Sequence, residues 1–74
     1  MEEKKFIESF VSVFDDTEIS ELTMDTEFKK LDEWSSLNAL GLLAVMSEEY
    51  EVELTGKDIE KSNTIRDIYN IIKG

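Results

Sequence analysis

Two adjacent serines, Ser35 and Ser36, are the side chains of this sequence whose type and position best suit chemistry. They stand directly before an apolar stretch that begins at Leu37, where a serine can cap the unpaired amide groups of a helix's first turn. Those amide groups and the positive end of the helix dipole also favour an anionic group such as a phosphodiester, by about 0.3–1 kcal/mol at an exposed position. The pair is therefore interpreted either as an ordinary N-cap or as a site suited to a phosphate.

The residue inventory argues against catalysis by the chain itself. The sequence has no Cys and no His, so it lacks a thiolate nucleophile and the usual base that activates a serine. Phosphoryl transfer at these serines would need its base and metal from a separate enzyme. A calcium-loop pattern that starts at Asp25 fails because Lys30 stands where such loops need glycine. The sequence predicts no enzyme, no catalytic residue and no metal site.

Length and charge restrict the classes of protein further. The chain has 74 residues with 18 acidic and 8 basic side chains, a net charge of −10. A chain of this length forms one domain, residues 1–74, with a single core and no room for a deep cleft. The negative surface repels nucleic acid and attracts basic patches on protein partners. The alternative interpretation is that the negative charge serves only to keep the protein soluble.

Hydropathy gives no sign of a membrane or secreted protein. The longest uninterrupted apolar run, residues 42–46, is far shorter than the roughly 20 residues of a membrane helix. No apolar signal segment follows Met1, and there is no cysteine for disulfides. We expect a cytoplasmic monomer without a membrane span.

Apolar periodicity predicts an all-α fold. Helices are expected over about 2–14, from Ser35 or Ser36 to about 51, over a short stretch near 56–61, and from Thr64 to Gly74. These elements make a small four-helix bundle of three main helices and one short helix. A long loop, residues 15–35, joins the first two helices, and 51–54 forms an extended link.

Several side chains have predicted places in this fold. The loop should be fixed by apolar anchors at Ile19, Leu22, Met24, Phe28 and Leu31. The core, or a groove at its edge, should include Phe28, Leu42, Val45, Met46 and Ile68. Trp34 is expected to pack as a hydrophobic staple at the start of the second helix. Gly41 either permits a close approach or is a tolerated defect that costs about 1 kcal/mol against alanine.

With these elements placed, the chain resembles the acyl carrier protein family over nearly its whole length. The segment Leu31-Asp32-Glu33-Trp34-Ser35-Ser36-Leu37 is similar to that of stand-alone bacterial carriers whose motif reads W-D-S-L, here W-S-S-L. The resemblance continues through the apolar second helix, the short third helix and the Thr64-Ile65-Arg66-Asp67 helix start.

The resemblance implies a covalent 4′-phosphopantetheine arm on Ser36, added by a phosphopantetheinyl transferase. The arm would hold an acyl or aminoacyl group as a thioester. Ser35 departs from the family, which usually has aspartate there, and we expect it to keep the capping role that both residue types perform.

The resemblance also implies a docking face on the second helix. Leu37, Leu40 and Ala44 match positions that face partner enzymes, and Glu48 and Glu49 match acids that meet basic docking patches on enzymes that load or use the acyl group. For Leu40, core packing is an equally good interpretation.

Asn38 and Gly41 stand where the family often has carboxylates. The acidic face is thus thinner near the serines and is retained at Asp32, Glu33 and the two glutamates of the second helix, which favours a dedicated pathway. Two other classes stay open: an acidic helical interaction module in which Ser36 is only a cap, and an unmodified carrier relative that acts as a regulator.

Overall fold

The computed structural model describes residues 3–74, which contain four α-helices and no β-strand. The helices are α1 (Glu3–Val11), α2 (Ser36–Tyr50), α3 (Gly56–Lys61) and α4 (Ile65–Lys73). The prediction of an all-α chain with three longer helices and one short helix is confirmed. None of the helices in this part of the chain has the length and apolar character needed to cross a membrane.

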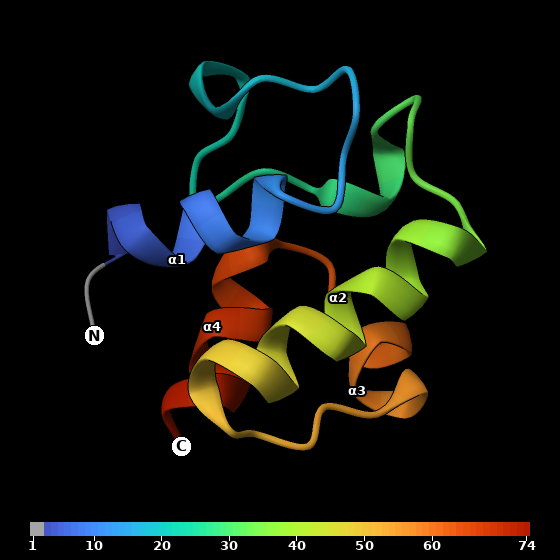
Figure 1. Ribbon diagram of the computed structural model, residues 1–74. Helices are drawn as coiled ribbons and strands as arrows, with labels where there is room; N and C mark the ends of the chain where they lie inside the picture. Colours follow the sequence, from blue (N-terminus) through green and yellow to red (C-terminus); the bar gives the residue numbers. More distant parts are fainter. Residues whose placement is uncertain (1–2) are drawn as a thin grey trace.

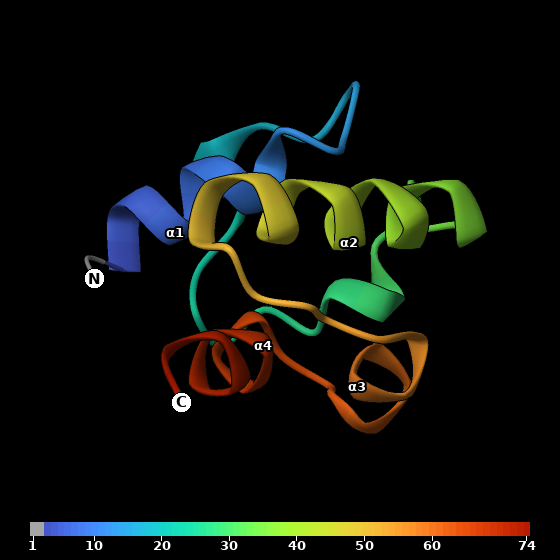
Figure 2. The same cartoon turned by 60° about the horizontal axis from the view of Figure 1, so that its bottom comes forward.

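The helices pack in pairs around one core. α1 packs against α2 and α4, and α3 packs against the same two helices. Figure 1 shows the connection between α1 and α2 passing over α1 before it returns to the start of α2, and Figure 2 shows α3 and α4 together on one side of α2. This connection contains two short 3-10 helices, η1 (Ile19–Glu21) and η2 (Phe28–Lys30).

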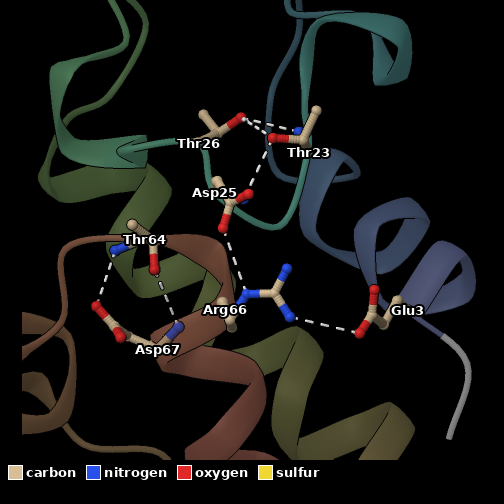
Figure 3. Close-up of polar contacts among 7 residues, drawn as sticks. All are labelled: Glu3, Thr23, Asp25, Thr26, Thr64, Arg66 and Asp67. Carbon is tan, nitrogen blue, oxygen red and sulfur yellow. Dashed lines mark hydrogen bonds and ion pairs between the residues drawn. The ribbon is translucent and has the colours of Figure 1, made fainter.

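Capping boxes define where α3 and α4 begin. The Thr64 hydroxyl accepts a hydrogen bond from the amide of Asp67, and the Asp67 carboxylate accepts one from the amide of Thr64 (Figure 3). Thr55 and Asp58 make the same exchange at the start of α3. The helix start that was predicted at Thr64 is confirmed, and the box of Thr55 and Asp58 was not predicted.

α1 is shorter than the predicted helix over about 2–14, of which Glu2 lies outside the described residues. The α-helix ends at Val11, and the next three amides donate to carbonyls three residues back, as Phe14 does to Val11 at 2.9 Å. The Ser12 hydroxyl donates to the Ser9 carbonyl at 2.6 Å. Such local side-chain bonds compete with the α-helical pattern, so the last predicted turn tightens and does not continue α1.

The core combines aromatic rings with aliphatic side chains of α2 and α4. Its buried apolar residues are Phe6, Phe10, Phe14, Leu22, Met24, Phe28, Leu42, Met46, Leu54, Ile59, Ile65, Ile68, Tyr69 and Ile72. The predicted core is confirmed except that Val45 is only half-buried. The prediction that Ile19 anchors the loop is wrong. Ile19 is 40% exposed and lines a shallow open groove together with Ile7 of α1.

The connection is bonded to the start of α4. The amides of Arg66 and of the residue before it donate to the carbonyls of Met24 and Thr26 at 2.8 and 3.1 Å. The Arg66 side chain lies between Asp25 and Glu3, at 3.4 and 3.5 Å (Figure 3). Exposed ion pairs of this kind contribute about 0–1 kcal/mol, so the backbone hydrogen bonds define the position of this part of the connection.

Gly41 lies where α2 passes the side chain of Val13. A methyl group on Gly41 would lie 3.4 Å from Cγ1 of Val13, an ordinary van der Waals distance. The approach is therefore close but leaves room for alanine. Gly41→Ala is expected to raise the free energy of unfolding by about 1 kcal/mol in urea denaturation because alanine favours helix. Ala44→Gly, on the exposed side of the same helix, should lower it by a similar amount, and a loss of stability in Gly41→Ala would show that Val13 leaves too little space.

Candidate functional site

The start of α2 differs from the predicted serine cap. Ser35 occupies the N-cap position with an extended backbone (φ −154°, ψ 175°), but its side chain accepts no capping hydrogen bond. Its hydroxyl instead donates to Oδ1 of Asn38 at 2.8 Å. The expectation that the Ser35 hydroxyl caps α2 is wrong, because its oxygen accepts no hydrogen bond from the amides of the first turn.

The first turn of α2 is open to an anion. α2 has neither a side-chain cap nor an acidic residue in its first turn, whereas the first turns of α3 and α4 each carry a capping box with an aspartate. Amide groups at a helix start that no side chain caps can donate to an external phosphate, and the helix dipole favours its charge. Among α2, α3 and α4, only α2 offers this arrangement.

One face of α2 carries most of the predicted site to the surface. Ser36, Leu37, Leu40, Ala44, Glu48 and Glu49 are all exposed. Ser36, Leu40, Ala44 and Glu48 follow one another at a spacing of four residues, and Leu37 lies three residues before Leu40, so all of them except Glu49 share one stripe. Glu49 is exposed beside the stripe, one residue farther round the helix.

Two leucines on that stripe are unusually accessible. Leu37 is 79% exposed and Leu40 is 63% exposed, one turn apart and next to Ser36. Core packing of Leu40 is therefore excluded. Leu37 and Leu40 thus form an apolar patch on the surface of α2.

Four aromatic rings fix the residue before the serine pair. Trp34 lies against Phe28 and Phe14, with ring centroids 4.9 and 6.2 Å apart, and both phenylalanines contact Phe10 at 5.3 and 6.1 Å. We call these four residues the aromatic quartet. Trp34 was expected to pack as a staple at the start of α2, and it makes ring contacts with Phe28 of η2 and with Phe14, three residues after the end of α1. The backbone that leads to Ser36 is thus fixed to the core.

Glu33 has a structural role that the sequence did not reveal. Its carboxylate accepts hydrogen bonds from the amides of Asp15, Asp16 and Thr17 at 2.6, 2.9 and 2.9 Å, and from the Thr17 hydroxyl at 2.8 Å. Glu33, which was predicted to belong to the acidic docking face, thus has both carboxylate oxygens engaged within the chain. The turn-forming run directly after α1, whose amides need an acceptor, is the signal that could have indicated this contact.

These hydrogen bonds make stability depend on pH through Glu33. Desolvation raises the pKa of Glu33, but the hydrogen bonds from Asp16, Thr17 and Asp15 together hold it below its ordinary value of 4.5. A lowered pKa means that the ionised carboxylate stabilises the fold above the unfolded pKa, and that this contribution disappears as pH falls through the folded pKa.

Glu33→Gln is therefore expected to be less stable than the wild type at pH 7, with a difference that narrows as the pH falls below the ordinary pKa of 4.5. Urea unfolding at a series of pH values measures this difference. Asp32→Asn, which removes the exposed neighbouring carboxylate, serves as the matched control. The same pH dependence in both variants would contradict a specific role for the Glu33 hydrogen bonds.

The site thus consists of an exposed hydroxyl, open helix amides and two exposed leucines. The described residues contain no group of three or more His, Cys, Asp or Glu side chains placed to hold a metal ion. No model of a known protein family matches the chain. Function has to be inferred from the geometry at the start of α2.

Proposed function

We propose that this protein is an acyl carrier protein with a 4′-phosphopantetheine arm on Oγ of Ser36. The observation that supports this most strongly is the exposure of Ser36 at the start of a helix whose first turn has no side-chain cap and no carboxylate. These groups fit a phosphodiester, because amide donors and the helix dipole both favour its negative charge. When attached, the arm supplies the thiol that holds an acyl or aminoacyl group as a thioester.

The residues around Ser36 have separate tasks in this proposal. The first-turn amides of α2 hold the phosphodiester. Leu37, Leu40 and Ala44 contact an apolar patch on partner enzymes, and desolvation of the two leucines provides most of the contact energy. Glu48 and Glu49 attract basic side chains around that patch.

The wider assignment follows from the same chemistry. The four helices are proposed to form a carrier-type bundle in which the long α1–α2 connection brings Ser36 to one end. The net charge of −10 supports partners with basic patches over nucleic acid. We propose a cytoplasmic monomer that is modified by a phosphopantetheinyl transferase and meets enzymes that load or use its acyl group.

Intact-mass measurement tests the proposal. The purified chain is incubated with coenzyme A, magnesium and a transferase of broad specificity, beside a carrier protein known to accept the arm. The expected result is a gain of one arm, located by peptide mapping on the peptide that contains Ser36. No gain while the control carrier is modified would overturn the proposal and favour an interaction module or an unmodified regulator.

A further inference from the structure

Residues on both sides of Ser36 are hydrogen-bonded to one short segment, residues 13–17, which begins two residues after the end of α1. Three residues before Ser36, the Glu33 carboxylate accepts the amides of the last three residues of this segment. Two residues after Ser36, Nδ2 of Asn38 donates to the carbonyl oxygen of Val13 at 2.7 Å. The turn that presents Ser36 is therefore held at both ends by the same part of the chain.

Asn38 uses both halves of its amide group. The Val13 carbonyl can only accept a hydrogen bond, so the NH2 group of Asn38 must face it. Oδ1 of Asn38 is then left to accept the hydrogen bond from Oγ of Ser35, 2.8 Å away. A carboxylate at position 38 could not donate to Val13. Ser35 and Asn38, two positions near Ser36 at which the family that the chain resembles usually or often has carboxylates, are thus paired with each other.

The backbone of α2 runs close to Val13 at this point. Gly41 lies one turn after Asn38 and would place a methyl group only 3.4 Å from the Val13 side chain. Asn38 is half-buried in the same contact. The hydrogen bond to Val13 is thus partly shielded from water, and it joins two backbones that already lie together.

We propose that Asn38 is a positioning residue for the modification of Ser36. Its bridge between Val13 and Ser35, together with the Glu33 contact, holds the first turn of α2 in one orientation relative to the end of α1. This inference rests on the proposed function. Group transfer to a serine hydroxyl depends on the position of the oxygen, and a displacement of about 1 Å can lower the rate on the order of 100-fold.

Two variants of Asn38 test the role. Asn38→Leu removes both hydrogen bonds, and Asn38→Asp removes the donor to Val13 while it keeps an acceptor for Ser35. Asn70→Asp, an exposed position on α4, is the matched control for the added charge. The first measurement is the NMR order parameter of the backbone amides at residues 35–37 in the unmodified protein. It is expected to fall from about 0.85, typical of rigid backbone, toward 0.6 in both Asn38 variants.

The second measurement is the rate of arm attachment, with the folded fraction of each variant taken from urea unfolding. For both Asn38 variants, kcat of the transferase should fall at least about tenfold. KM should stay near the wild-type value, because Leu37 and Leu40 remain in place. Asn70→Asp should match the wild type in both measurements.

Unchanged order parameters in a folded Asn38 variant would overturn the positioning role. So would an attachment rate that falls no further than the folded fraction. If Asn38→Leu does not fold, the more conservative Asn38→Asp decides. If the wild type itself accepts no arm, the proposed function fails, and the order parameters alone then show whether Asn38 holds the turn.

Discussion

Ser36→Ala is expected to abolish attachment of the phosphopantetheine arm completely, whereas Ser35→Ala should retain it. The two hydroxyls are adjacent in the sequence but differ in environment. Ser35 donates its proton to Asn38, while Ser36 is exposed at the open start of α2. Both serines are exposed, but Asn38 engages the Ser35 hydroxyl, which leaves the Ser36 oxygen as the one available for attachment of a phosphate at the start of the helix.

A time course of intact mass with transferase and coenzyme A checks this prediction. Both variants should first be compared with the wild type by circular dichroism and urea unfolding, so that loss of modification is not confused with loss of folding. If the Ser36→Ala variant is still modified, the attachment site lies elsewhere. If the Ser35→Ala variant folds but is not modified, attachment requires both serines.

Phe28→Ala should lower the free energy of unfolding by about 3–5 kcal/mol, the usual cost of truncating a buried phenylalanine. Phe28 is fully buried in the aromatic quartet, with its ring 4.9 Å from Trp34 and 5.3 Å from Phe10. At about 0.05–0.15 kcal/mol per residue, a chain of this length has a total stability of roughly 4–11 kcal/mol. One substitution in the connection would thus remove a large part of the stability of the whole fold.

Urea unfolding followed by circular dichroism measures the effect of Phe28→Ala. Ile19→Ala provides the control, because Ile19 belongs to the same connection but is 40% exposed, and its truncation should cost less than about 1 kcal/mol. Similar losses in the two variants would show that the quartet does not anchor the connection.

The sequence was sufficient to predict that four helices form, and where α2, α3 and α4 begin, because the signals for them are local. Thr64 and Asp67 mark the start of α4, and isoleucines at helical spacing in the same segment, such as Ile68, form its buried face. The bounds of α3 and α2 follow in the same way from a short apolar pattern and from the serines before Leu37. Such signals need no knowledge of the rest of the fold.

The contacts around Ser36 could not be predicted because their partners are distant in the sequence. Glu33 binds residues that precede it by 16 to 18 positions, and Asn38 binds Val13 across 25. The sequence also does not show whether a serine at a helix start caps the helix, and the Ser35 hydroxyl donates to Asn38 without capping α2. The exposure of Leu37 and Leu40 depends on which side of α2 faces the core. For Leu37, its place in the first turn of the helix already indicated an exposed side chain, whereas for Leu40 the sequence left core packing open.

Trp34 is the only tryptophan of the chain, and it stands two residues before Ser36 with its indole against Phe28. Indole emission shifts to longer wavelength when the ring passes from an apolar contact into water. The protein therefore carries a natural fluorophore whose emission wavelength reports the immediate surroundings of Ser36 without an added label. A red shift at unchanged helical content would distinguish local opening of this end of the molecule from denaturation of the whole chain.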